Sequence, residues 1–201
     1  MSMELNEEKV RALLEYGQKV VAVEFSGEVY FVVESGKLTT DVVFSAQKDY
    51  FLFDKNFKNI GFLYLSEQKY GEELIASAKR AGCLEVPEFS VSLSHIEIGE
   101  DYRRKHLGDF LINRAIKDVC ALSQGWSKET LPIMFVRANS AVTLPFYRKW
   151  GAVDNQRYPN EDFGLFNCMI IKSPTPKEEY DGKVLKEISS PKEKKEEGRN
   201  F

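Results

Sequence analysis

The stretch from residue 95 to residue 120 constrains the fold most, because it combines the signals of a strand, a basic turn and a helix. A short β-branched run containing Ile96 and Ile98 ends at Gly99, and the chain then enters the basic turn 103–108, RRKHLG. After this turn, apolar residues recur at the spacing of one helix face: Phe110, Leu111, Ala115, Ile116 and Val119. The pattern predicts a strand that ends at Gly99 and a helix that begins in or just after the basic turn.

The basic turn is a candidate anion site. A helix N-terminus presents unpaired N–H groups and a partial positive charge, and Arg103, Arg104 and Lys105 bring three cationic side chains to the same place. A phosphate or a pyrophosphate is the ligand that such a site favours. A basic helix start is also common on solvated surfaces, so both interpretations stay open for the turn alone.

The turn resembles motif A of the GNAT superfamily of acyl-CoA N-acyltransferases, whose signature is Arg or Gln, two residues, Gly, one residue, then Gly or Ala. Arg103 fills the first position and Gly108 the last, whereas His106 stands where the first glycine is expected. Glycine there lets the backbone approach a phosphate and adopt positive φ. Histidine tolerates positive φ better than most residues and can contact a phosphate when protonated, so we expect acetyl-CoA binding to be retained.

Residues 137–152 resemble motif B of the same family, in which a strand ends in Asn and a short helix leads to the pattern Tyr, two residues, apolar, Gly, apolar. Tyr147, Trp150 and Gly151 stand at the expected spacing. Asn139 lies one residue early, and Ser140 occupies the usual Asn position. The two motifs occur in the family's order with a helix and a strand between them, and this combination is far more specific than either motif alone.

The resemblance implies an α/β (α+β) GNAT fold: a mixed central β-sheet of about six to seven strands, flanked by helices, whose splayed central strands form the acyl-CoA cleft. It covers roughly residues 55–172. Residues 1–54 would supply the variable N-terminal part of a single domain spanning 1–172. Within this domain, a helical insertion at 67–90 either covers a cleft or lengthens a loop.

Periodicity and turn residues predict the other elements. Residues 5–18 suit an amphipathic helix closed by glycine, and 20–25 with 29–35 suit a hairpin. Further expected elements are strands at 38–44, 49–53, 59–66, 131–136 and 163–172, a helix at 72–81 and a polar connection at 155–162.

The composition changes abruptly after residue 172. In residues 173–201 lysine and glutamate nearly balance, and apolar residues are too few to build a core. We expect a charged C-terminal tail that is disordered or loosely docked, with a partner-binding segment around 184–188 as the alternative.

Composition bounds the remaining possibilities. The chain has 201 residues, 43% of them hydrophobic, which is enough for one good core. A net charge of −3 argues against a dedicated nucleic-acid binder. Cys83, Cys120 and Cys168 lack paired spacing and are expected to be free thiols in a reducing cytosol. No apolar run reaches ~18 residues and the charged start does not suit a signal peptide, so we expect a cytoplasmic protein without a membrane partner.

The resemblance also implies an activity, an acyltransferase that moves an acetyl group from acetyl-CoA directly to a primary amine in a ternary complex. The amine would belong to a small molecule or to a protein or peptide, no metal is expected, and the protein would be a monomer or a homodimer. The turn would bind the pyrophosphate through its main-chain N–H groups, and the central strand would bind the pantetheine arm and the oxyanion. The implied cosubstrate-binding residues are Ile96, Glu97, Ile98, Arg103, Arg104, Lys105, His106, Leu107, Gly108, Asn139 and Ser140.

Tyr147 matches the family's general acid, which protonates the departing thiolate. A tyrosine with an unperturbed pKa of ~10 stays protonated at neutral pH, as a proton donor must. The structural alternative is an ordinary half-buried aromatic residue beside Phe146 and Trp150.

The general base stays open. The family's usual positions on the central strand correspond to Ser92 and Ser94, neither of which is a base. His95 and Glu97 are chemically better, but strand alternation directs them to the opposite face unless a bulge intervenes. Other candidates are Glu85 and Glu88 in the insertion and an ordered water.

Two other functions remain as alternatives. The altered glycine and the missing matched base would suit a non-catalytic acyl-CoA-binding or regulatory module on the same scaffold. A helix inserted before the acyl-CoA strand also occurs in GNAT toxins that acetylate aminoacyl-tRNA, although the sequence pI of 5.6 counts against this reading.

Overall fold

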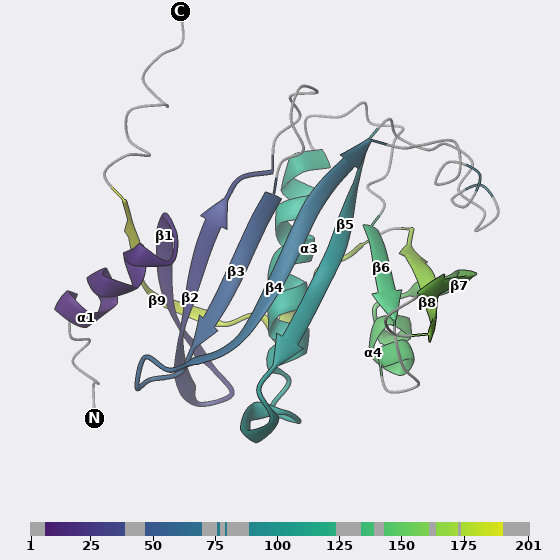
Figure 1. Ribbon diagram of the computed structural model, residues 1–201. Helices are drawn as coiled ribbons and strands as arrows, with labels where there is room; N and C mark the ends of the chain where they lie inside the picture. Colours follow the sequence, from purple (N-terminus) through teal and green to yellow (C-terminus); the bar gives the residue numbers. More distant parts are fainter. Residues whose placement is uncertain are drawn as a thin grey trace, which may run out of the picture.

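Nine strands form one mixed sheet in the computed structural model, which describes residues 7–38, 47–69, 76, 79, 89–123, 134–138, 143–160, 164–172 and 174–190 (Figure 1). Their spatial order is β7-β8-β6-β5-β4-β3-β2-β1-β9, and every neighbouring pair is antiparallel except β5 and β6. The strands are β1 (Lys19–Phe25), β2 (Glu28–Gly36), β3 (Gln47–Phe53), β4 (Asn59–Lys69), β5 (Phe89–Ile98), β6 (Met134–Ala138), β7 (Ala152–Asn160), β8 (Gly164–Ile171) and β9 (Lys183–Ser189). The α-helices with full bounds are α1 (Glu7–Ala12), α3 (Leu107–Ser123) and α4 (Thr143–Lys149).

Helices cover both faces of this sheet, which confirms the predicted mixed α/β class. The apolar face of α3 packs on one side of the central strands, where Leu111, Ile112 and Ile116 are fully buried. On the other side, Val10 of α1 and Leu13 of the 3-10 turn that follows pack on β1 to β3 in a second, smaller cluster. Successive residues of β1 join different clusters, as expected for a strand buried on both faces.

The predicted hairpin of β1 and β2 is confirmed. Ser26 and Gly27 both have positive φ, 51° and 78°, which is the backbone of a type I′ turn. This turn matches the right-handed twist of the two strands and sets their register, in which Phe25 pairs with Glu28.

A buried ion cluster ties α3 to β2 and β3. The Arg114 guanidinium donates hydrogen bonds to Glu34, and the Lys48 ammonium lies 3.1 Å from Glu34 and 2.6 Å from Asp118. Burial raises the pKa of the Glu34 carboxyl, but Arg114 and Lys48 outweigh this effect and the pKa is lowered. The carboxylate therefore stays charged, and its partners hold the helix on the sheet.

Strands β5 and β6 run side by side for only a short distance. Their parallel pairing joins Val91–Leu93 to Met134–Val136, after which β5 continues to Ile98 without β6. On its other side, β5 pairs with β4 as far as Ile98. The two central strands therefore part, as the predicted splay required.

Two expectations about the sheet were wrong, and both concern edge strands. Residues 155–162 were expected to be a polar connection, but residues 152–160 form β7, in which Pro159 pairs with Leu165 of β8. An edge strand pairs on one side only, so it tolerates proline and needs few apolar residues. This strand and β9 raise the count from the expected six or seven to nine.

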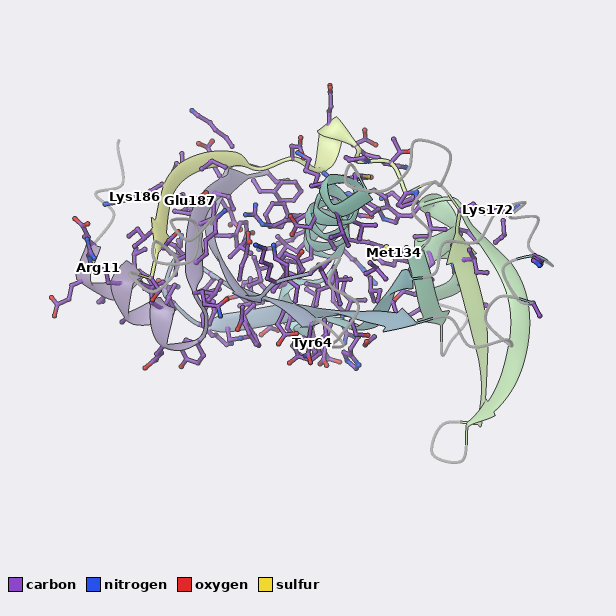
Figure 2. The ribbon with its side chains drawn as sticks, turned by 90° about the horizontal axis from the view of Figure 1, so that it is seen from above. Arg11, Tyr64, Met134, Lys172, Lys186 and Glu187 are labelled. Carbon is purple, nitrogen blue, oxygen red and sulfur yellow. The ribbon has the colours of Figure 1, made fainter. Side chains whose placement is uncertain are left out.

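The segment 174–190, called the strap below, was expected to lie in a solvated tail. Instead, α3 lies between the sheet and the strap (Figures 1 and 2). The buried Asn113 side chain donates to the Lys177 carbonyl at 2.9 Å and accepts from the Lys177 N–H at 2.7 Å. The strap then forms β9, which pairs with β1 and inserts Ile188 into the smaller cluster. The supposed partner-binding segment 184–188 thus pairs with the chain's own first strand.

Other predicted elements differ from the structure in length or fall outside the described residues. The predicted first helix is shorter than expected, α1 being followed by a 3-10 turn at Leu13–Glu15. The predicted strand 38–44 lies outside the described ranges except for Leu38. Of the predicted helix 72–81, only Ala76 and Lys79 are described, and both are helical. Cys120 forms no disulfide within the described residues. No helix within the described ranges is long and apolar enough to cross a membrane.

The docking of β9 gives a stability prediction. Replacing Ile188, which is 9% exposed, by Ala removes apolar contacts of α1 and β1 and should lower the free energy of unfolding by about 2 kcal/mol. Val184→Ala on the same strand is the control, since Val184 is 55% exposed and its truncation should cost under about 0.5 kcal/mol. Urea denaturation measures both, and equal small effects would show that β9 does not contribute to the fold.

Candidate functional site

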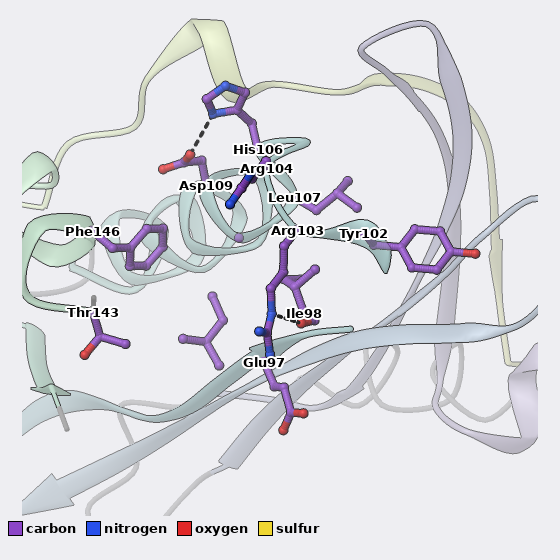
Figure 3. A pocket seen from close by; sticks show the side chains of 12 residues that line it. Glu97, Ile98, Tyr102, Arg103, Arg104, His106, Leu107, Asp109, Thr143 and Phe146 are labelled. Atoms are coloured by element: carbon purple, nitrogen blue, oxygen red, sulfur yellow. Dashed lines mark hydrogen bonds and ion pairs between the residues drawn. The ribbon is translucent and has the colours of Figure 1, made fainter. Parts of the chain in front are cut away.

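A pocket of about 670 Å³ opens beyond the point where β5 leaves β6 (Figure 3). Its wall combines the end of β5, the basic turn, the first turn of α3 and the near side of α4. The lining residues are Ile96, Glu97, Ile98, Tyr102, Arg103, Arg104, His106, Leu107, Gly108, Asp109, Thr143 and Phe146. The pocket therefore gathers most of the predicted cosubstrate-binding residues. Lys105 is not among the lining residues, and Asn139 and Ser140 lie outside the described ranges.

The basic turn has an unusual backbone. Arg104 and His106 have φ values of 64° and 58°, in the left-handed region that favours glycine. His106 thus adopts, at the family's glycine position, a conformation that glycine would adopt without strain. Its carbonyl accepts the Phe110 N–H at 2.9 Å, the first bond of α3, so the turn leads directly into the helix.

The three predicted cations point in different directions. Lys105 lies 3.5 Å from Glu28 and above the Tyr102 ring, so it leans toward the β1–β2 hairpin. The Arg103 Nε donates to the Ile98 carbonyl at 3.2 Å and ties the turn to the end of β5. The electropositive wall of the pocket therefore comes from Arg103, Arg104 and the N-terminus of α3, with Lys105 turned away.

Asp109 holds this wall together, and the sequence reasoning missed it. Its carboxylate, 8% exposed, lies 3.0 Å from His106 Nδ1 and 2.8 Å from Lys149 Nζ, and accepts the Trp150 indole N–H at 3.2 Å. The carboxylate thus joins the basic turn, α3 and the end of α4. Its position three residues after His106, in the first turn of a helix, was the only signal in the sequence.

Tyr147 is 3% exposed and lies one ring away from the pocket. Its ring packs edge-on against Phe146, which lines the pocket, at a centroid distance of 5.2 Å. Burial raises the pKa of its hydroxyl well above the usual value. Within the described part of the chain, the hydroxyl makes no hydrogen bond, which is unusual for a buried polar group.

A β-bulge decides which way the candidate bases point. Tyr64 pairs with His95 and Leu65 with Leu93, so Ser94 is an extra residue between them. Directly paired residues project on one face, and Ser94 Oγ lies 3.0 Å from Ser66 Oγ, whose partner is Ser92. The expectation that His95 and Glu97 lie opposite the two serines was therefore wrong, because simple alternation fails at a bulge.

His95 and Glu97 form a pair on this face, away from α3. His95 Nε2 lies 3.6 Å from Glu97 Oε2, and each side chain is more than half exposed. The imidazole stacks on Phe62 at 5.2 Å, and Phe62 stacks on Tyr64, which Figure 2 shows on the side of the sheet opposite α3. Glu97 also lines the pocket, so the pair connects the pocket with the aromatic face. Glu85 and Glu88 lie outside the described ranges.

The described residues contain no group of His, Cys, Asp and Glu that would hold a metal ion. The charged and titratable side chains that line the pocket are Arg103, Arg104, His106, Glu97, Asp109 and Tyr102. Tyr147 and His95 do not line it but contact the lining residues Phe146 and Glu97.

Comparison with known proteins gives distant likenesses only. No family model and no curated protein matches the sequence. Among solved structures, a bacterial toxin has a TM-score of 0.46 and 16% identity over 63% of this chain and 68% of that chain. The histone acetyltransferase HPA2 and related acetyltransferase of Corynebacterium glutamicum has a TM-score of 0.42 and 16% identity over 69% and 70%. The Escherichia coli ribosomal-protein-S18-alanine N-acetyltransferase has a TM-score of 0.41 and 15% identity over 65% of this chain and 71% of that chain. Likenesses this distant assign no function to the chain.

Asp109 gives a prediction that does not depend on any ligand. Asp109→Ala leaves the buried Trp150 N–H without an acceptor and removes the anion beside Lys149. The free energy of unfolding should therefore fall by about 1–3 kcal/mol. Chemical denaturation followed by tryptophan fluorescence measures this loss. The exposed Asp101→Ala is the control, and a loss of the same size there would contradict the proposed role of Asp109.

Proposed function

We propose that this chain is a GNAT-type N-acetyltransferase that transfers an acetyl group from acetyl-CoA to a primary amine. The observation that carries the proposal is the pocket between the parted end of β5, the basic turn and α4, with motif A on one wall and motif B on the other. A non-catalytic acyl-CoA-binding module would need the same pocket but not the groups that move protons.

The pocket matches acetyl-CoA in two separate features. Beyond Leu93, the edge of β5 that faces β6 has lost its parallel strand partner, so backbone groups at 94–98 can bond an extended chain such as pantetheine. At the far end of that edge, the left-handed turn and the N-terminus of α3 present N–H groups and positive charge to a pyrophosphate. The two features follow one another in the order in which they occur along acetyl-CoA.

The reaction needs a proton acceptor and a proton donor. The ammonium of the acceptor loses one proton, and its nitrogen attacks the thioester carbonyl. As the carbon–sulfur bond of the tetrahedral intermediate breaks to leave the amide, the nitrogen loses its second proton and the departing thiolate gains one, so the products are the amide, CoA as its thiol and one released proton. We assign removal of the proton to the His95–Glu97 pair, acting directly or through water, because both groups are on the open face and Glu97 reaches the pocket. We assign protonation of the thiolate to Tyr147, because its buried hydroxyl stays protonated and has no partner within the described residues.

The assignment of Tyr147 is testable by kinetics. Tyr147→Phe should lower kcat for thiol release from acetyl-CoA by about 10²-fold or more, because the leaving thiolate then lacks its proton donor, while the dissociation constant for acetyl-CoA stays the same. Thiol release is followed against a panel of primary amines, and the dissociation constant is measured by calorimetry.

Tyr16→Phe is the matched control, since Tyr16 is 50% exposed and lies on the N-terminal turn, away from the pocket. An unchanged rate in Tyr147→Phe would remove Tyr147 as the acid. Binding of acetyl-CoA without release for any amine would favour the non-catalytic module, and no binding to folded protein would reject both.

A further inference from the structure

Before it forms β9, the strap runs along the outer side of α3 and passes the basic turn at Tyr180. The Cys120 thiol donates to the Pro174 carbonyl at 3.1 Å near the C-terminal half of the helix. The Asn113 amide makes two hydrogen bonds with the backbone of Lys177 and also donates to the Asp181 carboxylate at 2.8 Å. Gly182 passes so close to the helix that an added Cβ would lie 3.0 Å from the Phe110 ring. The strap therefore has a defined register on α3.

This register brings Tyr180 to the N-terminal end of α3. Its ring lies 5.9 Å from the His106 ring and 5.5 Å from the Trp150 ring, measured between centroids. Lys149 Nζ lies 4.3 Å above the Tyr180 ring, and the same ammonium is bonded to Asp109. Tyr180 thus contacts all three residues that bond Asp109, namely His106 from the turn, Lys149 at the end of α4 and Trp150 just after it.

The basic turn needs such support, because its backbone is strained. A non-glycine residue at positive φ persists only where its surroundings hold it. The His106 side chain is 61% exposed, and its described contacts are the Asp109 carboxylate on one side and the Tyr180 ring on the other. These two contacts fix the orientation of the imidazole, and the fixed side chain in turn restrains His106 to its left-handed backbone conformation.

We propose that Tyr180 is a positioning residue for the pyrophosphate site. With Asp109 it keeps His106 in the left-handed conformation, so that the N–H groups of the turn point into the pocket. This inference rests on the proposed function, because it concerns the pyrophosphate of the acetyl-CoA assigned to that pocket. Tyr180 acts through His106 and does not line the pocket itself.

The proposal predicts a defect specific for the pyrophosphate. Tyr180→Ala should weaken binding of acetyl-CoA by about fivefold, because part of the cost of ordering the turn then falls on binding. Binding of S-acetyl-pantetheine, which lacks the pyrophosphate, should be unchanged. Tyr180→Phe keeps the ring and should behave as wild type. Calorimetry measures acetyl-CoA, and ligand-observed NMR measures the weaker pantetheine thioester.

A second variant separates positioning from general loosening of the fold. In a His106→Gly background the backbone adopts positive φ without a side chain to hold it, so adding Tyr180→Ala should no longer weaken acetyl-CoA binding. Leu185→Ala, in the same strap and 39% exposed, is the control for truncation of the strap.

The outcomes distinguish the two proposals. Equal losses for both thioesters, no loss for either, or the same loss with and without His106→Gly would overturn the role of Tyr180 and leave the proposed function intact. Wild-type protein that is folded but binds neither thioester would reject the proposed function itself.

Discussion

The site depends on the unequal pairing of β5. This strand pairs with β4 as far as Ile98 but with β6 over only three residue pairs, so its far edge is left open inside the sheet. Unpaired backbone groups are costly when water is excluded, and a strand interrupted in this way needs either solvent or a ligand along its edge. The parting of β5 and β6 therefore makes the pocket. Separately, the bulge at Ser94 directs His95 and Glu97 to the face of the sheet away from α3.

The basic end of the pocket is built on a strained turn that distant parts of the chain hold in place. Arg104 and His106 have left-handed backbones, and the support for His106 comes from Asp109. That carboxylate is in turn bonded to Lys149 and Trp150, some 40 residues later in the chain. The same cluster fixes α4, which carries Phe146 and Tyr147, to the first turn of α3. The proposed cosubstrate wall and the proposed acid are thus coupled through one buried carboxylate.

Much of the local structure followed from the sequence. The end of β5 at Ile98, the start of α3 in the basic turn and the hairpin of β1 and β2 were predicted correctly, because periodicity and turn residues act over a few neighbours. The two wrong elements, β7 and β9, are edge strands. Their sequences carry little apolar signal because each pairs on one side only. Strand β9 is recognisable only in the folded chain, where it pairs with β1 and Ile188 joins the cluster of α1 and β1.

The candidate site, like the fold, has features that the sequence predicted and features that only tertiary contacts decided. By itself, the sequence determined which chemical groups are available: a basic helix start, a histidine where the resembling motif has glycine, a tyrosine in the segment that resembles motif B, and two acid–base side chains on the central strand. The tertiary structure alone decided their orientation and support. In the folded chain, Lys105 points toward Glu28 and Tyr147 is buried. Asp109 contacts His106, and Tyr180 of the strap lies beside the basic turn. The physical reason is that composition and spacing specify local conformation, whereas a bulge, an edge pairing or a buried ion contact depends on residues that meet only after the chain has folded.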